Sequence, residues 1–224
     1  MAITFVAASA NQAAASGNIT ITPPATITDD IMICAVTSHD NVASTFPLNW
    51  TVYREGNNTT AMRSTLAWKR AVGAEAAFDV THAAGDGIVG NVAVYRGCIT
   101  ESGVINASIL THNGSSSTCT ATTITSTVDN CMLVFTMHDS DNGASSSQSS
   151  ANLGAMAERF DNASTQGLDE AVSGADVVQG AAAASGDSTG TFSLGPDVNS
   201  GGNTFLAPAL PPPVDSLKMM GVGI

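Results

Sequence analysis

Charged residues are scarce in this sequence, and positive charge is the scarcest. Charged side chains make up 12% of the chain, against about a quarter in an ordinary globular domain. Seven Lys and Arg residues face 19 Asp and Glu residues, which gives a net charge of −12. Such a field repels phosphate groups and anionic lipid, so the composition argues against nucleic-acid and membrane partners. An acidic surface serves either solubility or docking on a basic partner, and solubility is the simpler interpretation.

Long apolar runs are also missing. No stretch approaches the roughly 18 apolar residues of a membrane-spanning helix. The opening MAITFVAASANQ has no basic region, and its apolar run of five residues is too short for the core of a secretory signal. We therefore expect the protein to be made in a cytoplasm and used without a signal peptide.

The common catalytic signatures are missing or out of context. SxxK, HExxH and the P-loop are missing. GxSxG and GxGxxG each occur once, as GDSTG at residues 186–190 and GDGIVG at residues 85–90, but each is followed by an expected strand rather than by the helix that either motif requires. A glycosidase needs two acids on facing strands, and no persuasive pair emerges from Glu55, Glu75, Glu158 and Glu170. The sequence therefore predicts a protein without catalytic residues and without a cofactor.

Residues that commonly bind metals are scattered along the chain. The four cysteines, Cys34, Cys98, Cys119 and Cys131, show no CxxC spacing and are expected to be reduced and buried rather than paired. His39-Asp40 and His138-Asp139 occupy equivalent points of a repeat and could meet to hold an ion such as zinc. Polar residues are common where strands leave a sheet, however, and a duplication copies them. We therefore predict no metal site.

What the sequence does contain is a repeated strand-turn-strand pattern. Residues 19–37, ITITPPATITDDIMICAVT, are followed about 100 residues later by residues 122–139, TTITSTVDNCMLVFTMHD. The alternation of Ile19 and Ile21 with threonines indicates a half-buried strand, whereas the apolar run 31–36 is typical of a strand buried on both faces. Weaker matches continue to residue 207, so two halves, about 1–112 and 113–207, share one order of strands.

The chain reads as β-structure throughout, because no segment has an apolar stripe at helical spacing. We expect an all-β fold, a jelly-roll-like antiparallel β-sandwich with an internal pseudo-repeat, over residues 1–207. Gly90 lies within a strong strand and indicates a bulge or a close backbone contact. Strands are expected at 2–8, 19–22, 31–36, 49–54, 62–70, 76–81, 88–96, 104–110, 118–125, 131–138, 191–194 and 203–207, with turns or loops at 9–17, 56–58, 113–117 and 139–152.

Trp50 and Trp68 are the two tryptophans of the chain. Both fall in expected neighbouring strands. We interpret them as core anchors rather than as a ligand-stacking site, because large aromatic side chains dominate the packing of β-cores.

A different composition begins at residue 208. The C-terminal arm, residues 208–224, holds four of the eight prolines and ends in scattered apolar side chains. Three consecutive prolines favour a stiff polyproline segment. A short apolar arm that cannot cover itself either frays or lies on another subunit, and we favour the second. The residues expected to form this interface are Pro211, Pro212, Pro213, Leu217, Met219, Met220 and Ile224.

The ordered motifs NITIT-PP, IMICAV, NWTVYREG, STLAWKRA, AEAAFDVT and GNVAVYRG resemble a family of tailed-bacteriophage virion proteins with a jelly-roll-like β-sandwich. The resemblance covers about residues 1–207. It implies a structural role as a capsid decoration (cement) protein or as part of a head or tail fibre. The arm after residue 207 departs from the pattern, and no collagen-like or coiled-coil stalk is present, which favours the shell.

From these observations we expect a non-enzymatic virion component, assembled in the host cytoplasm. Its partners would be the major capsid protein and copies of itself, in a symmetric homo-oligomer such as a trimer. A second hypothesis is a fibre component or a receptor- or carbohydrate-binding module that uses loops 38–49 and 139–152 near Trp50. A third, a polysaccharide depolymerase, is the least favoured.

Overall fold

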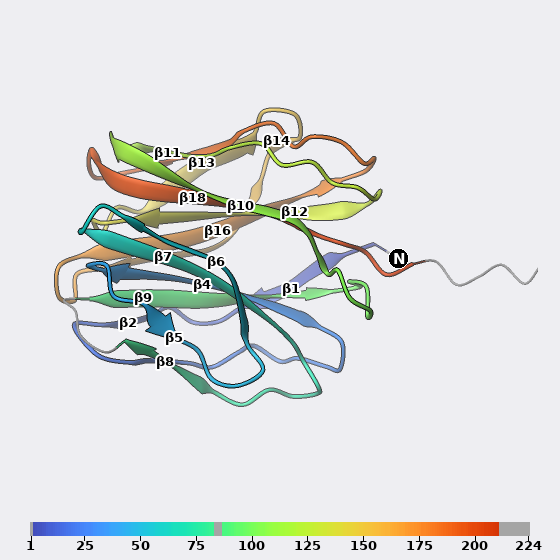
Figure 1. Cartoon of the computed structure of the whole chain (residues 1–224), viewed down its shortest axis with the longest axis horizontal. Helices are drawn as coiled ribbons and strands as arrows, with labels where there is room; N and C mark the ends of the chain where they lie inside the picture. The colour runs from blue at the N-terminus through green and yellow to red at the C-terminus, as the bar shows by residue number, and fades with distance from the viewer. Residues whose placement is uncertain (1, 83–86, 211–224) are drawn as a thin grey trace, which may run out of the picture.

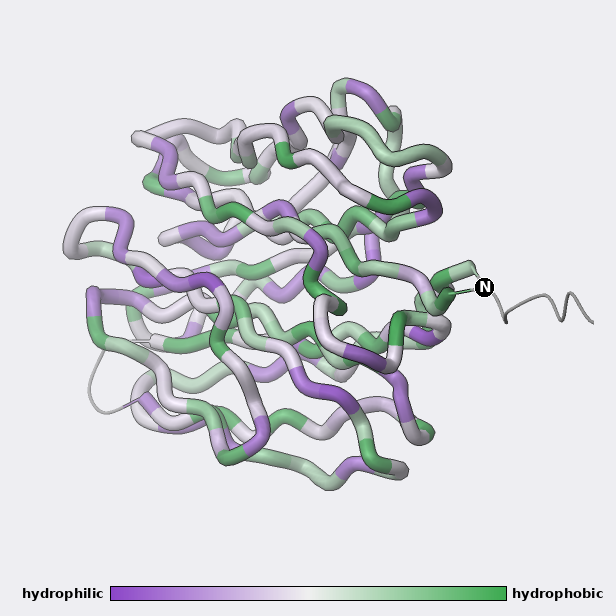
Figure 2. The backbone as a smooth tube through the Cα atoms, turned by 45° about the vertical axis from the view of Figure 1, so that its right-hand side comes forward, coloured by the Kyte–Doolittle hydropathy of each residue, from purple (hydrophilic) through white to green (hydrophobic). Residues whose placement is uncertain are grey.

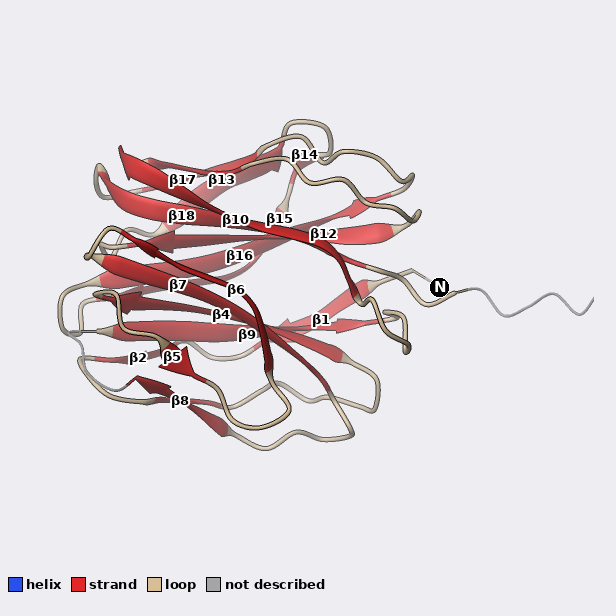
Figure 3. Cartoon of the chain, viewed as in Figure 1, coloured by secondary structure: helices blue, strands red, loops and turns tan. Residues whose placement is uncertain are grey.

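The computed structural model describes residues 2–82 and 87–210, and this part of the chain is built of strands with no helix (Figure 3). The all-β prediction is confirmed. The first half contains β1 (Thr4–Ala8), β2 (Gln12–Ala14), β3 (Ile19–Ile21), β4 (Ile31–His39), β5 (Ser44–Thr45), β6 (Thr51–Asn58), β7 (Met62–Arg70), β8 (Phe78–His82) and β9 (Ile88–Arg96). The second half contains β10 (Ile105–Ser116), β11 (Thr118–Ala121), β12 (Cys131–Asp139), β13 (Ser145–Ser150), β14 (Gly154–Ala155), β15 (Ala157–Ser164), β16 (Glu170–Gln179), β17 (Ser188–Phe192) and β18 (Asp197–Leu206).

The same strand order occurs in both halves. The large sheet of the first half runs β1-β9-β4-β7-β6, with β2 also paired to β9, and that of the second half runs β10-β18-β12-β16-β15. Each half adds a small sheet, β3-β8-β5 or β11-β17-β13-β14. All pairings between these strands are antiparallel.

The four sheets stack as layers, with the two large sheets in the middle and the small sheets outside (Figure 1). Side chains on β4 explain this order, because successive residues of a strand point to opposite faces. Ile31, Ile33 and Ala35 pack into the central layer between the large sheets. Met32, Cys34 and Val36 pack on the other face, against β3 and β8. The prediction that 31–36 is buried on both faces is therefore confirmed.

Apolar clusters fill the three spaces between the layers. The central cluster joins the halves through side chains such as Leu66, Tyr95, Val134 and Leu206. Two smaller clusters, around Phe135 and Phe205, lie within the second half. Since each fully buried large apolar side chain contributes roughly 1.5–3 kcal/mol, the central layer binds the halves firmly. Figure 2 shows apolar segments running through the stack.

Hydrogen bonds also cross between the halves. The Thr37 hydroxyl donates to the Ala171 carbonyl at 3.0 Å. The Tyr53 hydroxyl lies 3.0 Å from the hydroxyl of Thr204. The Asn58 amide donates to the Asn199 carbonyl at 2.7 Å. Buried polar groups require such partners, so these bonds also restrict how the two halves can be aligned.

Several boundaries differ from the sequence prediction. Strand β2 lies in the expected connection 9–17, β13 lies in the expected loop 139–152, and β16 was not foreseen. The polar stretches 113–117 and 56–58 are largely extended β10 and β6, because strands at the rim of a sheet can be polar on both faces.

Gly90 marks a close contact rather than a bulge. Its pairing with β4 continues without a register shift. A Cβ atom built at this position would lie 2.7 Å from Cδ1 of Ile19, closer than atoms can pack. The glycine therefore lets β3 lie directly over β9.

Candidate functional site

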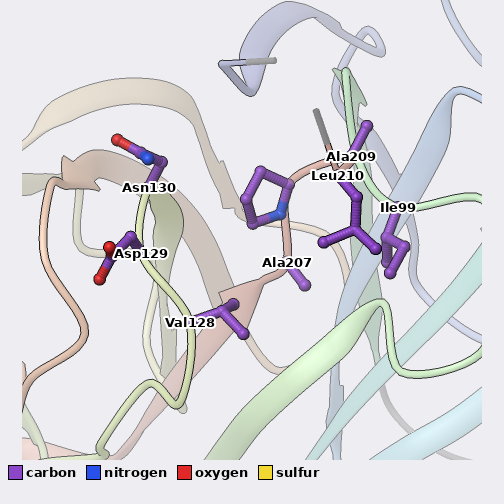
Figure 4. Close-up of a pocket in the computed structure, with 8 residues that line it drawn as sticks. Ile99, Val128, Asp129, Asn130, Ala207, Ala209 and Leu210 are labelled. Carbon is purple, nitrogen blue, oxygen red and sulfur yellow. The ribbon is translucent and has the colours of Figure 1, made fainter. Parts of the chain in front are cut away.

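An apolar hollow opens where the chain leaves β18. It has a volume of about 420 Å³ and is lined by Ile99, Val128, Asp129, Asn130, Ala207, Pro208, Ala209 and Leu210 (Figure 4). Leu210 is 68% exposed and Val128 is 38% exposed. Apolar side chains left open on a hollowed surface commonly mark a contact site for a partner.

One wall of the hollow is the segment that precedes the arm. The Ala207 N–H donates to the Val104 carbonyl at 2.9 Å, and its carbonyl accepts from the Ile99 N–H at 3.0 Å. The Ala209 N–H donates to the Gly97 carbonyl at 2.8 Å. These bonds hold the chain against the turn after β9 as far as residue 209.

The opposite wall is the turn before β12. Asn130 has a left-handed backbone, with φ of 58°, a conformation that asparagine tolerates better than most residues. Its N–H donates to the Gly180 carbonyl at 3.0 Å. One carboxylate oxygen of Asp129 accepts from the Ala182 N–H at 2.8 Å. Both walls are thus anchored by hydrogen bonds, and the Asp129 side chain points away from the hollow (Figure 4).

The hollow is mainly apolar. Among the described residues that line it there is no histidine or cysteine, and Asp129 is the one ionisable residue. Sequence reasoning identified the arm but missed this hollow, because its walls come from three separate stretches of the chain.

The arm residues named above, from Pro211 to Ile224, lie outside the described residues. The structure describes only Pro208, Ala209 and Leu210 of the arm. Pro208 forms an isolated bridge to Cys98, so the arm leaves the sandwich beside the first half rather than from the second half alone.

The two tryptophans are half-buried and face different cores. Trp68 packs against the central cluster between the large sheets. Trp50 packs against the cluster of the first half, with its ring centroid 4.6 Å from that of Phe78 and 5.8 Å from that of Phe46. Hollows of about 180 and 450 Å³ flank Phe78, and Trp50 lines the smaller of them.

The two His-Asp pairs have different surroundings. Because the Thr37 hydroxyl donates to Ala171, it accepts from Nδ1 of His138 at 2.9 Å. Burial lowers the pKa of His138 to about 3, so this imidazole is neutral. In the first half, Asp40 instead lies 3.7 Å from Nε2 of His82. Residues 2–82 and 87–210 contain no group of three His, Cys, Asp or Glu side chains placed to hold a metal ion.

Glu170 is an unusual buried acid at the start of β16. It is fully buried, and neither carboxyl oxygen has a hydrogen-bond partner within the described chain. The carboxyl lies against Gly87. Burial, and then the charge of Asp169, raise its pKa to about 9. Burial and the charge of Asp197 likewise raise the pKa of Asp139 to about 8. Both groups are enclosed, so their protonation bears on the stability of the fold.

All four cysteines are buried and unpaired, as the sequence predicts. Burial raises the pKa of Cys98 to about 12 and that of Cys131 to about 11. Burial also raises the pKa values of Cys34 and Cys119 well above the ordinary range. Such thiols stay protonated and unreactive.

Comparison with known proteins adds no relative: no protein-family model, curated protein or solved structure matches the chain. In the described residues, no helix is long and apolar enough to cross a membrane. The resemblance to phage virion proteins therefore stays an expectation drawn from the sequence motifs.

Proposed function

We propose that this chain is a non-enzymatic structural subunit of a tailed-phage particle, a decoration (cement) protein of the head. The observation that carries the proposal is the apolar hollow at the root of an apolar, proline-rich arm. The ordered strand motifs support it independently, through the resemblance to virion proteins. The proposed partners are the major capsid protein and other copies of this chain.

Physical considerations fit an adhesive role. A net charge of −12 makes separate copies repel one another, so lasting contacts must come from buried apolar area. A specific interface buries about 1,200–2,000 Å² in total, and an extended arm is an economical way to add such area to a compact body. The doubled sandwich supplies a rigid platform from which the arm can reach its neighbours.

Removal of residues 211–224 tests the proposal. The deletion begins after Leu210 because the backbone bonds of Ala207 and Ala209 belong to the sandwich. The full-length and shortened chains are each mixed with undecorated phage heads, and bound protein is measured by co-sedimentation and electron microscopy. We expect the shortened chain to keep its unfolding midpoint and to lose head binding. Normal decoration by the shortened chain contradicts the proposal.

A second candidate function is recognition of a host receptor or carbohydrate. The observation that favours it is the aromatic group of Trp50, Phe46 and Phe78 beside two hollows, with Leu48 90% exposed at the rim. Aromatic faces next to polar groups can stack on sugar rings. Immunogold labelling decides between the candidates, because a label on the tail tip supports recognition and a label over the head supports decoration.

A further inference from the structure

We infer that the smaller hollow beside Phe78 is a binding site for one neutral sugar ring, a hexopyranose that stacks on Trp50 and is held at its edge by Lys69 and Glu75. Such a site rests on the second candidate function, recognition of a carbohydrate, and goes beyond it in the class of ligand and in the polar residues that hold it. Three features of the molecule support it: a fixed aromatic wall, a pair of opposite charges beside that wall, and the size of the hollow.

The aromatic wall is held in place without a ligand. Asn49 has a left-handed backbone, with φ of 75°, and the Trp50 N–H donates to the Pro47 carbonyl at 3.3 Å, so residues 47–50 form a tight turn. The ring centroid of Trp50 lies 4.6 Å from that of Phe78, yet Trp50 is only half-buried and lines the hollow. A flat aromatic surface stacks on the C–H face of a sugar ring, and a wall that is already ordered loses little entropy on binding.

A pair of opposite charges lies beside the aromatic wall. The Lys69 ammonium donates to one carboxylate oxygen of Glu75 at 2.5 Å, and the two side chains are 17% and 9% exposed. The Val72 N–H donates to the other oxygen at 3.0 Å. Burial would raise the pKa of Glu75, but these hydrogen bonds and the charge of Lys69 lower it, so the carboxylate is ionised at neutral pH. An ammonium group has three N–H donors, and a carboxylate has about four acceptor sites, so the pair offers both donors and acceptors to sugar hydroxyls.

The charge balance of the site favours a neutral ligand. Among the described residues that line the smaller hollow, Lys69 and Glu75 are the two ionisable ones, and their charges cancel. The larger hollow on the other side of Phe78 adds Asp79, and the chain as a whole carries a net charge of −12. A sugar that carries a carboxylate would therefore be repelled, whereas an uncharged one would not.

The smaller hollow has room for one ring. Its volume is about 180 Å³, below the roughly 300–1,000 Å³ of pockets that enclose drug-sized ligands. Aromatic and apolar walls with a few placed polar groups are the usual construction of a small-molecule site. The larger hollow of about 450 Å³ shares Pro47, Ala77 and Phe78 with the smaller one, which leaves space beyond Phe78 for a second ring of a longer glycan.

The two tryptophans provide the test, because each gives one indole N–H signal in a proton–nitrogen correlation spectrum and Trp68 packs against the central cluster instead. The full-length protein is titrated with glucose, galactose, mannose and N-acetylglucosamine, and with N-acetylneuraminic acid as the anionic probe; Trp68→Phe assigns the two signals. We expect at least one neutral sugar to shift the Trp50 signal saturably and to leave the Trp68 signal unchanged, with the anionic sugar at least about tenfold weaker. No shift with any neutral sugar, equal shifts of both indole signals, or tighter binding of the anionic sugar overturns the inference.

Two arginine variants give a second readout with matched charge. Ala77 is exposed and lines both hollows, whereas Ala74 is exposed and lines neither. Ala77→Arg should abolish the shift of the Trp50 signal and Ala74→Arg should preserve it, with unchanged thermal unfolding midpoints; sugar binding that survives Ala77→Arg contradicts the assigned site. Immunogold labelling separates the sugar site from the candidate function on which it rests. A label on the tail tip without sugar binding refutes the sugar site alone, whereas sugar binding with a label over the head refutes tail recognition alone.

Discussion

Glu170 gives the most direct test of how this fold uses its buried polar residues. Its carboxyl is fully buried without a hydrogen-bond partner among the described residues. Burial, and then the charge of Asp169, raise its pKa from 4.5 to about 9. Between these values the folded chain keeps a proton that the unfolded chain releases. Folding stability contributed by this group is therefore present below pH 4.5 and is lost as the pH rises towards 9.

The size of the effect follows from the difference between the two pKa values. One pKa unit corresponds to about 1.4 kcal/mol. At pH 7, about 2.5 pH units above the pKa of the unfolded chain, the unfolded carboxyl has lost its proton while the folded one has kept it. Glu170 therefore costs up to about 3 kcal/mol of stability at pH 7 relative to acidic pH. Glu170→Gln removes the titrating group and keeps the shape. The variant should gain about 3 kcal/mol on the wild type between pH 4 and pH 7.

Urea unfolding of both proteins at pH 4, 5.5 and 7 measures this gain. The quantity of interest is how the difference in unfolding free energy between Glu170→Gln and the wild type changes with pH. Any cost of the new amide that does not depend on pH cancels from this change. Glu101→Gln, at an exposed turn residue, is the matched control and should show no such trend. A Glu170→Gln difference that stays constant from pH 4 to pH 7 refutes the reasoning and means that the carboxyl is solvated in the folded protein.

Two further predictions concern stability. Burial would raise the pKa of Asp30, but the hydrogen bonds from Arg96, the hydrogen bond from the Ile27 N–H and the charge of Arg96 together outweigh it and lower the pKa below 3.8. Asp30→Asn should therefore destabilise the protein by about 1.5 kcal/mol at pH 7, and the loss should shrink as the pH falls below 3.8, as measured by urea unfolding. Gly90→Ala should cost about 1–3 kcal/mol because its Cβ would meet Ile19. Gly114→Ala is the control, because a Cβ at position 114 would meet no atom within 4 Å, and it should leave the thermal unfolding midpoint nearly unchanged. Equal shifts of the midpoint in the two variants contradict the packing argument.

The sequence predicts those parts of the fold whose pattern is local. Residues 31–36 are apolar on both faces and residues 88–95 are buried on both faces, because each stretch lies in a large sheet covered on both sides, and β9 has the expected boundaries. Strand β16 escaped prediction because polar residues interrupt it. Asp176 within it is buried, and Arg159 on β15 compensates it at 2.7 Å. That partner is recognisable only after the strands are paired.

The candidate site was predictable only in part. The composition of the arm suggests an interface, but the hollow combines Ile99, the turn 128–130 and the end of β18. No pattern in the sequence links these stretches. They meet because the pairing of Pro208 with Cys98 brings the end of the second half against the first. A surface assembled by topology leaves no periodic signal in any one segment.

The position of β18 determines how the molecule would respond to a pulling force. A load applied through residues 208–210 enters a strand that is paired on both sides, to β10 and to β12, along nearly its whole length. Interstrand bonds in an antiparallel sheet lie across the strand direction, so tension along β18 shears many of them together instead of opening them one after another. A strand held in this way can carry tension while the rest of the sandwich stays folded.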